Sequence, residues 1–600
     1  MASVRLLRTI GVRPVQRVQR NISCAVCPRN PTGVRVTVKG GRCSGVPAPV
    51  WSQLSSAYGS TDSGASVEPV VRSPFVDVPI PSDVSLVGHM FDDFGRYGNF
   101  TALIDGVSGR RTTYAELQSE IVRVASALWR LGIRKGDVVT LFSENRPEFI
   151  VMFLSLAAVG AVVSATNSVY TSGELAHALT HAKAKLLIAS AENLDVAKQA
   201  AVAAQFPLKD VIVLGEAAGF RPYSALLQDD GKCFPENLDW DPREDLVALP
   251  FSSGTTGLPK GVMLSHYNLV ANVEQTRTGD VLNYISGSDV LLGVLPWFHI
   301  YGQVVVALSG LKAGASLISM PKFSPELFIN VIKDHKPTFL HVVPPIMLFL
   351  AKHGIVNKDD FSSVHTLVTA AATCGLETSR EVRDRLDVPR IRQGYGLTET
   401  SPLTHVNPGE NYRYETCGLA VPNTDYKIID VATGKDLSRG EEGEVCVRGP
   451  QVMKGYFNNE EATRKTMKDG WLLTGDIGIA DHDGHMIITD RMKELIKYKG
   501  FQVAPAELES LLVTHPAVAD SAVIGAPDER AGELPRAYVV LKPNLHVSED
   551  ELQKFIADKV APYKHLRGGV EFRKEIPKSA AGKILRRILR DEFAEKNLSQ

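Results

Sequence analysis

The sequence predicts an α/β protein: a large N-terminal domain with parallel sheets covered by helices, followed by a small α+β C-terminal domain. Two observations support this fold class. Short continuous apolar runs alternate with helix-length segments over most of the chain before Asp490, which is typical of buried parallel strands covered on both faces. After Asp490 the predicted order becomes helix, strand, strand, helix and strand within about 110 residues, an ordinary size for a second domain.

The N-terminal leader has the composition of a targeting segment. Residues 1–61 contain no Asp or Glu but carry eight arginines and one lysine. Arginines interleave with apolar residues and no long apolar core follows, which favours a mitochondrial transit peptide over residues 1–60. A disordered, non-targeting extension is the alternative. Residues 61–80 are proline-rich and aperiodic, so we expect a linker or irregular arm before a large domain at 81–489 and a small domain at 490–600.

Composition and charge narrow the function classes. The net charge of -1 gives no argument for nucleic-acid binding, because no bulk basic field exists. The seven cysteines are scattered and imply neither a disulfide framework nor a zinc site. Residues 149–165 are apolar but shorter than the roughly 20 residues that a spanning helix needs. Gly160 divides them into a helix and a buried strand, so we expect no transmembrane segment.

Local signals place the elements in order. Thr113 and Glu116 form a capping box that starts a helix, which should end at Gly132 before a strand at 138–142. Further strands are expected at 185–189, 211–214, 290–295, 315–319, 338–343, 365–369 and 390–393. In the small domain the patterns predict helices at 505–513 and 548–559, and strands at 518–524, 537–541 and 570–572.

A glycine-rich stretch, FSSGTTGLPKG at residues 251–261, lies between apolar runs. Glycines let the backbone approach a ligand, hydroxyls and amides offer hydrogen-bond donors, and Lys260 adds a positive charge, which together suit phosphate oxygens. The stretch is not a Walker A loop, because Pro259 and Gly261 stand where that motif needs Gly and Ser or Thr. A flexible turn is the alternative reading.

Three further loops follow predicted strands and carry unusual residues. They are PWFHIYG at 296–302, AAAT at 370–373 and GYGLTE at 394–399. Ligands bind at the carboxyl ends of strands in such sheets, so we expect these loops to converge on one site.

Six spaced motifs together resemble one family. They are FSSGTTGLPKG, PWFHIYG, QGYGLTE, GWLLTGD, DRMKELIKYKGFQVAPAELE and PKSAAGKILRR, spread over roughly residues 80–590. In this order they resemble the adenylate-forming superfamily of acyl-CoA synthetases, luciferases and peptide-synthetase adenylation domains, with most likeness to 4-coumarate:CoA ligases and luciferase-like acyl-CoA synthetases. The resemblance implies a C-terminal lid that rotates between two half-reactions, and the use of ATP, Mg²⁺ and, as second substrate, coenzyme A.

The resemblance also implies the nucleotide site. The residues expected to contact ATP are Ser252, Ser253, Gly254, Thr255, Thr256, Gly257, Lys260, Ala371, Ala372, Tyr395, Thr398, Asp476, Arg491 and Lys583. Among them Thr255, Thr256 and Lys260 would hold the β- and γ-phosphates. Asp476 would accept both ribose hydroxyls, and Tyr395 would stack on adenine.

The resemblance assigns catalytic and CoA-binding roles as well. Catalysis is expected from Thr255, Lys260, His299, Glu399 and Lys583. Glu399 would be the Mg²⁺ ligand, and Lys583 would bridge the substrate carboxylate and the α-phosphate. His299 would separate acyl pocket and CoA tunnel, although a satisfied core histidine is an equal alternative. Lys493 would be the hinge of the lid, and the residues expected to face CoA are Lys497, Lys499 and Gly500.

The acyl pocket is predicted to be apolar and narrow. Its expected lining is Tyr301, Val305, Ala370, Pro402 and Leu403. Ala370 stands where the ligases of this family usually have glycine, and its methyl group should narrow the pocket. We therefore expect a small-molecule substrate that is a medium-chain fatty or aryl acid. Alternatives are a luciferase-like oxidation, loading of a carrier protein, or a nucleotide-binding scaffold without chemistry, and the oligomeric state stays open.

Overall fold

The structure is a computed structural model that describes residues 69–252, 260–278, 281–372, 374–409, 413–498, 501–528, 530–560, 562–579 and 582–598. The chain divides into one unit of residues 1–63 and one of residues 64–600, and the described ranges all belong to the second unit. The predicted transit peptide therefore lies outside the described residues.

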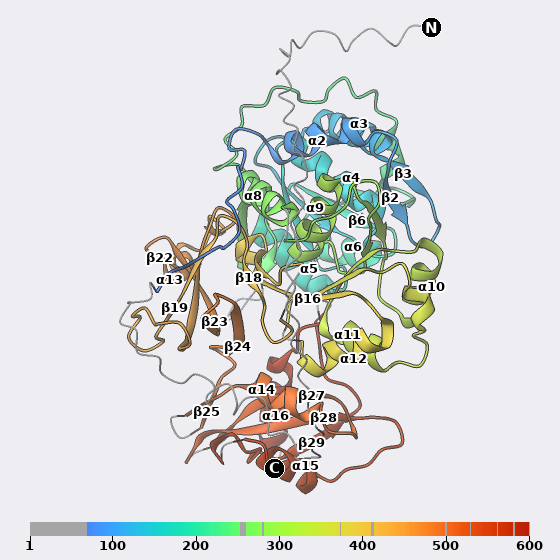
Figure 1. The fold of residues 1–600 in the computed structure, drawn as a ribbon. Helices are drawn as coiled ribbons and strands as arrows, with labels where there is room; N and C mark the ends of the chain where they lie inside the picture. The colour runs from blue at the N-terminus through green and yellow to red at the C-terminus, as the bar shows by residue number, and fades with distance from the viewer. Residues whose placement is uncertain are drawn as a thin grey trace, which may run out of the picture. The chain divides into compact units, whose positions relative to one another are not determined.

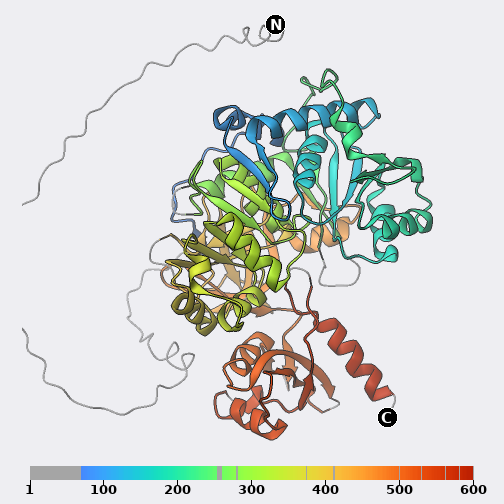
Figure 2. The same cartoon turned by 90° about the vertical axis from the view of Figure 1, so that its right-hand side faces the viewer.

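The first large sheet ends in the hairpin that carries the glycine-rich loop. Its strands run β10 (Phe251–Ser252), β11 (Lys260–Ser265), β9 (Leu246–Ala248), β5 (Val162–Thr166), β4 (Val138–Phe142), β6 (Leu186–Ser190), β7 (Val211–Leu214) and β8 (Arg221–Pro222), with β21 (Gly455–Tyr456) paired to β11. Strands β5, β4, β6, β7 and β8 pair in parallel and the first four are buried along their length, except at one end of β4, as their apolar runs predict. In Figure 2 the cyan strands of this sheet run between helices.

The second large sheet carries the other predicted loops. Its strands run β18 (Leu419–Ala420), β17 (Leu403–Val406), β16 (Arg390–Gly396), β15 (Thr366–Thr369), β14 (Phe339–Val342), β12 (Val290–Gly293), β13 (Ser316–Ser319), β2 (Thr101–Asp105) and β3 (Arg111–Thr113). Pairing is parallel from β16 through to β2 and antiparallel at both edges. The expected parallel sheets covered by helices are thus confirmed.

Helices cover these sheets (Figure 1). They are α2 (Leu86–Tyr97), α3 (Tyr114–Arg130), α4 (Pro147–Ala158), α5 (Ser172–Ala182), α6 (Leu194–Ala203), α7 (Tyr223–Leu227), α8 (His266–Arg277), α9 (Ser309–Ala313), α10 (Pro325–His335), α11 (Pro344–Lys352) and α12 (Leu376–Leu386). The capping box of α3 forms as predicted, because Thr113 Oγ1 accepts the Glu116 amide at 3.2 Å and the Glu116 carboxylate accepts the Thr113 amide at 2.8 Å.

The apolar segment at residues 149–165 is part of the core. It folds as α4 and β5, separated by Gly160 at φ 78°, and both elements are buried. Over the described ranges, no helix is long and apolar enough to cross a membrane. Core packing therefore explains the apolar composition of this segment.

A third, antiparallel sheet was not predicted from the sequence. Its strands run β1 (Val71–Arg72), β19 (Asp425–Ile429), β20 (Glu442–Arg448), β23 (Trp471–Ala480) and β22 (Met467–Lys468), with β24 (Met486–Arg491) paired to β23 and the short helix α13 (Glu460–Thr466) nearby in sequence. Residues 71–72 were expected in a linker or irregular arm, but they pair with β19, which lies more than 350 residues further along the chain. Such a distant pairing leaves no local pattern.

The C-terminal residues have a hydrophobic core of their own. The sheet runs β26 (Phe501–Val503), β25 (Ile496–Tyr498), β28 (Gly532–Leu541) and β27 (Val518–Asp528), with β29 (Val570–Arg573) paired to β28. Helices α14 (Pro505–Leu512) and α15 (Glu549–Ala557) contribute Leu508, Leu512, Leu552 and Ile556 to this core. The patterns predicted α14, α15, β27, β28 and β29, whereas the short strands β25 and β26 were not predicted. Helix α16 (Arg586–Leu598) was missed because its composition is mostly polar.

Candidate active site

The hairpin β10/β11 brackets the glycine-rich loop. Ser252 pairs with Lys260 across the hairpin, so the last residue before the loop and the lysine after it are neighbours. Ser253, Gly254, Thr255, Thr256 and Gly257 lie outside the described residues, and their expected phosphate contacts stay predictions. The position of Ser252 and Lys260 fixes where that loop begins and ends.

Glu399 lies beside this hairpin. It belongs to the 3-10 turn Thr398–Thr400 that follows β16, and its backbone oxygen accepts the amide of Met453 at 2.8 Å. Its Oε1 accepts hydrogen bonds from Ser252 Oγ and from Tyr456 Oη, both at 2.9 Å. The structure therefore brings a fixed carboxylate to the start of the glycine-rich loop.

Tyr456 completes this group, although sequence reasoning did not single it out. It lies on β21, which pairs with β11, and Lys260 Nζ is 5.1 Å from the centre of its ring. Burial and the neighbouring Glu399 raise the pKa of the Tyr456 hydroxyl, which therefore stays a hydrogen-bond donor at neutral pH.

Asp476 organises a second group of predicted residues. Its side chain is 4% exposed, and Arg491 Nε lies 3.0 Å from its Oδ1 because the two residues pair directly across β23 and β24. Tyr395 Oη donates to its Oδ2 at 2.8 Å. Burial and the Asp476 charge raise the pKa of Tyr395, while Asp476 also raises the pKa of Arg491. Each carboxylate oxygen can accept a further hydrogen bond, so the arrangement fits a ligand with paired hydroxyls.

The loop after β15 lies next to Tyr395 in the sheet. Ala370 is buried at its start, whereas Ala371 and Ala372 are exposed, and Ala371 has the left-handed φ of 72°. Thr373 lies outside the described residues. In β16 a side chain at Gly396 would place its Cβ 2.0 Å from the Pro402 carbonyl oxygen, so this turn before Glu399 requires glycine.

Lys583 is half-buried among charged groups. Its amide donates to Ser579 Oγ at 3.1 Å, and its carbonyl accepts the Ser579 amide at 2.8 Å. Burial, then Arg491 and Lys493, lower the pKa of its ammonium to about 7, against the opposite effects of Asp476 and Glu494. The lysine expected to act on the α-phosphate is therefore electrostatically coupled to the residues around Asp476.

The remaining residues expected from the C-terminal part are placed as follows. Lys493 is half-buried, and burial together with Arg491 lowers its pKa. Lys497 is exposed on β25, and its amide donates to the Glu533 carboxylate at 2.7 Å. Lys499 and Gly500 lie outside the described residues, so their expected contact with CoA stays a prediction.

His299 precedes a π-helix at Tyr301–Leu308, which the sequence did not predict. The histidine is half-buried, and its Nδ1 accepts the Tyr301 amide at 3.3 Å. Burial and then the Lys583 charge lower the pKa of His299 to about 4, so its imidazole is neutral at physiological pH.

The expected acyl-pocket residues are all buried. Tyr301, Val305, Ala370 and Leu403 belong to one buried hydrophobic cluster, and Pro402 is buried next to Leu403. Behind Tyr301 lies His341, whose Nδ1 is 3.0 Å from the Tyr301 hydroxyl and whose Nε2 is 2.8 Å from the hydroxyl of Tyr284. Tyr284 also donates to the Val305 carbonyl at 3.1 Å.

Comparison with known proteins decides the family. The family model described as AMP-binding enzyme matches residues 91–457, and that described as AMP-binding enzyme C-terminal domain matches residues 507–583. The chain belongs to the AMP-binding enzyme family. 4-coumarate--CoA ligase 1 of Petroselinum crispum is 41% identical over 539 residues, which cover 88% of this chain and 98% of the relative.

Solved structures of the family have the same fold. ATP-bound MatB from Rhodopseudomonas palustris is 30% identical with a TM-score of 0.77, and the match covers 85% of this chain and 98% of MatB. A benzoate CoA ligase from Burkholderia xenovorans LB400 is 27% identical with a TM-score of 0.76, covering 84% of this chain and all of that one, at 100%. The expected fold class and the resemblance to adenylate-forming enzymes are confirmed.

The enzyme class and cofactors predicted for this AMP-binding enzyme are confirmed as well. Relatives of 40% and 41% identity are AMP-forming acid:CoA ligases, and ATP, Mg²⁺ and CoA are expected for the family. The residues fit the ion, because Mg²⁺ usually takes one or two protein carboxylates besides phosphate oxygens. Glu399 offers one carboxylate, and no group of three or more His, Cys, Asp or Glu side chains could hold a metal in the described part of the chain.

Proposed function

We propose that this AMP-binding enzyme converts a medium-chain fatty or aryl carboxylic acid into its acyl-AMP and then into acyl-CoA. One observation carries the proposal. Lys583, with a pKa lowered to about 7, interacts electrostatically with Arg491 and with the buried Asp476, which form an ion pair, so a positive charge acts on the side chains suited to a nucleotide. Carboxylate activation by ATP needs such a charge at the α-phosphate.

In the first step a carboxylate oxygen of the acid attacks the α-phosphorus of ATP. The bond between the α-phosphorus and the bridging oxygen breaks, and pyrophosphate leaves. Lys260 and Ser252 flank the loop expected to hold the β- and γ-phosphates, while Asp476 would orient the ribose. Bound Mg²⁺, held by Glu399 and phosphate oxygens, would neutralise charge on the departing group.

In the second step the CoA sulfur attacks the acyl carbonyl carbon. The bond from that carbon to the phosphate oxygen breaks, AMP leaves, and the thiol proton passes to solvent. The imidazole of His299 is neutral, so it is a polar neighbour of the reacting groups and is not repelled by the positive charge of Lys583. An acceptor other than CoA, such as oxygen or a carrier thiol, would give a different product from the same acyl-AMP.

The chemistry of the predicted pocket supports an apolar acid. The Tyr284 hydroxyl donates its hydrogen bond to the Val305 carbonyl, so it must accept one from Nε2 of the neutral His341. Nδ1 of that histidine then accepts a hydrogen bond from the Tyr301 hydroxyl. The Tyr301 hydroxyl is thereby occupied and cannot donate to a substrate hydroxyl. Two relatives are named for 4-coumarate and benzoate, and the Ala370 methyl favours a slimmer acid than a hydroxycinnamate.

The test is pyrophosphate release with a panel of acids, measured with and without CoA. The panel should contain straight-chain acids of increasing length, benzoate and 4-coumarate. We expect release to depend on the acid, turnover to require CoA, and medium-chain acids or benzoate to exceed 4-coumarate. A preference for 4-coumarate would refute the narrowing of the pocket by Ala370, and failure of every medium-chain and aryl acid to promote pyrophosphate release would overturn the substrate class. Turnover without CoA would overturn the second step.

We also propose that the protein is imported into mitochondria. The support is the acid-free, arginine-rich composition of residues 1–61. A fusion of residues 1–60 to a fluorescent reporter should enter mitochondria. A reporter that stays in the cytosol together with the full chain would refute this localisation.

A further inference from the structure

The nucleotide site joins side chains from two different sheets. Tyr395 belongs to β16 of the second large sheet, whereas Asp476 and Arg491 belong to β23 and β24 of the antiparallel sheet. The contact of 2.8 Å between Tyr395 and Asp476 requires that the two sheets keep one relative position here. Because a nucleotide would contact Tyr395 with its adenine and Asp476 with its ribose, its binding depends on what holds the two sheets at this spacing.

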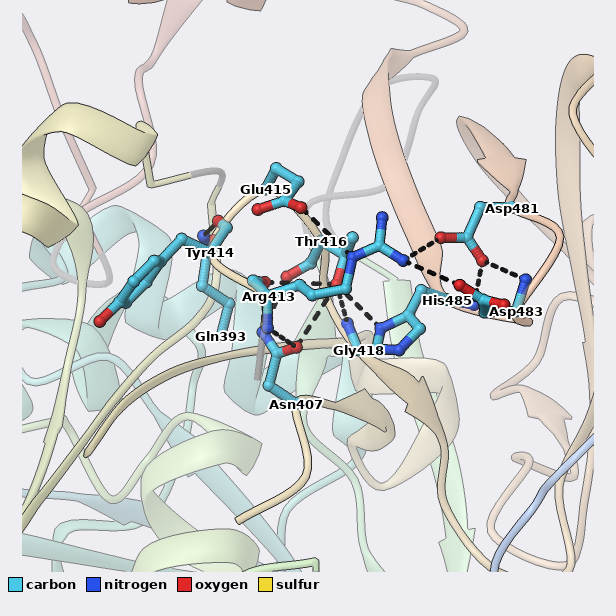
Figure 3. Close-up of polar contacts among 10 residues, drawn as sticks. All are labelled: Gln393, Asn407, Arg413, Tyr414, Glu415, Thr416, Gly418, Asp481, Asp483 and His485. Carbon is cyan, nitrogen blue, oxygen red and sulfur yellow. Dashed lines mark hydrogen bonds and ion pairs between the residues drawn. The ribbon is translucent and has the colours of Figure 1, made fainter. Parts of the chain in front are cut away.

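A cluster of polar residues connects the two sheets, and we call it the connector cluster (Figure 3). Its members are Gln393, Asn407, Arg413, Tyr414, Glu415, Thr416, Gly418, Asp481, Asp483 and His485. The members come from β16, from the segment between β17 and β18, and from the turn between β23 and β24. The cluster therefore spans the joint on which the nucleotide site depends.

On the side of the second large sheet, Gln393 links the cluster to the loop after β15, where Ala371 and Ala372 are expected to contact ATP. Its Nε2 donates to the carbonyls of Cys374, at 3.2 Å, and of Tyr414, and its Oε1 accepts the Cys374 amide at 3.4 Å. Cys374 follows the Ala370–Ala372 segment, and Tyr395 lies two residues after Gln393. A shift of the Tyr414 backbone would therefore also displace Tyr395 and the Ala370–Ala372 segment, the two parts of the chain expected to contact the adenine.

Asn407 binds the backbone of the residues that precede β18. Its Nδ2 donates to the carbonyls of Arg413 at 3.1 Å and Thr416 at 2.9 Å, and its Oδ1 accepts the Arg413 amide at 3.2 Å. Gly418 ends the loop at φ 89°, and a Cβ there would lie 2.0 Å from the Val406 carbonyl carbon. The backbone of Arg413 is therefore fixed relative to β17.

On the side of the antiparallel sheet, Asp481 receives the Arg413 side chain (Figure 3). Arg413 Nη1 lies 2.6 Å from Asp481 Oδ2 and 3.5 Å from Asp483 Oδ2, and its Nε donates to Glu415 at 3.2 Å. The Asp481 side chain is 5% exposed, and its Oδ1 accepts the amides of Asp483 and His485 at 3.0 and 2.8 Å. The carboxylate is thus built into the turn directly after β23, the strand that carries Asp476.

Further contacts reinforce the joint without replacing the ion pair. Thr416 Oγ1 lies 3.2 Å from His485 Nδ1, and Cys417 and Gly418 exchange backbone hydrogen bonds of 2.8 Å with Met486. These contacts hold the backbones together. Among the cluster contacts described above, the Arg413 side chain alone binds a buried charge after β23. Substitution of Arg413 therefore removes the charged link between the two sheets and leaves the backbone contacts in place.

We propose that Arg413 is a positioning residue for the nucleotide: by binding Asp481 it sets the distance between Tyr395 and Asp476 and so determines how strongly the site selects a nucleotide with a complete ribose. The inference deepens the proposed function and rests on its assignment of Asp476 to the ribose. Misplacement of a bound group by about 1 Å can lower a reaction rate as much as 100-fold, so a shift of Asp476 should also have a measurable effect on acyl-AMP formation.

The test compares equilibrium binding of ATP and 2′-deoxy-ATP to the full chain by titration calorimetry. The variants are Arg413→Gln and Arg413→Lys, with Arg448→Gln as matched control, because Arg448 forms a 2.7 Å ion pair with Asp425 in the same sheet outside the connector cluster. We expect Arg413→Gln to weaken the binding of ATP about tenfold or more, as the loss of a hydrogen bond to a charged group does, and to weaken the binding of 2′-deoxy-ATP much less. Arg413→Lys should restore part of the preference, and Arg448→Gln should leave it unchanged.

Several outcomes would overturn the proposal. Equal weakening of both nucleotides, or an unchanged preference in a folded Arg413→Gln variant, would show that Arg413 does not set the ribose contact. If Arg413→Gln does not fold, Asp481→Asn supplies the same test, because it keeps the shape of the side chain and removes its charge. Binding is read without turnover, so wild-type chain that selects ATP but releases no pyrophosphate would refute the proposed function and leave the positioning role standing.

Discussion

The charge on Lys583 should set the upper pH limit of acyl-AMP formation. Burial, with Arg491 and Lys493, lowers the pKa of its ammonium from 10.5 to about 7. The ammonium, not the amine, stabilises negative charge on the α-phosphate, so the rate follows the protonated fraction. At one pH unit above the pKa about a tenth of the lysines are protonated, and at two units about a hundredth.

The assay is acid-dependent pyrophosphate release at low ATP, because kcat/KM reports the ionisation of the free enzyme. We expect kcat/KM for ATP to fall about tenfold per pH unit above pH 7. The kcat profile should bend at higher pH, since bound phosphates favour the ammonium. Lys583→Arg should be slower but nearly flat over the same range, because a guanidinium stays charged.

The same shift has a consequence for stability. The folded pKa of about 7 lies below the unfolded value, so the unfolded state binds more protons between these pH values and the free energy of unfolding rises with pH through that window. Lys583→Ala removes the unfavourable free energy of burying this ammonium at neutral pH, so the variant should not have a lower Tm. Its rate of acyl-AMP formation should fall about 10²- to 10³-fold. If kcat/KM for ATP of Lys583→Arg fell with pH as steeply as that of the wild-type enzyme, the pH limit could not be assigned to Lys583.

Three other changes test separate parts of the site. Tyr456→Phe removes one of the two hydrogen-bond donors to Glu399. It should raise the KM for Mg·ATP about tenfold, since a hydrogen bond to a charged group contributes roughly 1.5–3 kcal/mol. An unchanged KM would show that Tyr456 has no role at the metal site. Ala370→Gly should shift kcat/KM toward bulky aryl acids by about 1–3 kcal/mol, whereas an unchanged substrate profile would mean that other residues line the pocket. Gly500→Leu should block thioester formation but keep first-turnover pyrophosphate release, and equal loss of both would contradict the expected lid face.

Local signals explain how much of the fold could be predicted. The continuous apolar runs of β4, β5, β6 and β7 reflect burial on both faces, and the Thr113 capping box needs only two residues three positions apart. The pairing of β1 with β19 depends on residues more than 350 positions apart. Within the π-helix at Tyr301–Leu308, the Val305 carbonyl accepts a hydrogen bond from Tyr284, which is also outside the local sequence. Neither leaves a periodic signature.

The candidate site shows the same division. Asp476, Tyr395 and Arg491 were predicted from motifs, and in the structure both Tyr395 and Arg491 lie within hydrogen-bond distance of Asp476. Tyr456 and Arg413 carry no motif of their own, because their roles arise from neighbours on other strands. A tyrosine after Lys-Gly and an arginine before Tyr-Glu look like ordinary surface residues until the partners Glu399 and Asp481 are known.

Isolation of the enzyme-bound intermediate tests the central claim most directly. The chain should be incubated with ATP, Mg²⁺ and its preferred acid without CoA, separated from free nucleotide, and then mixed with CoA. We predict about one acyl-AMP per active site, consistent with a single nucleotide site, and its conversion to acyl-CoA and AMP in one turnover. Recovery of unchanged ATP, or an acyl-AMP that CoA does not discharge, would contradict the account.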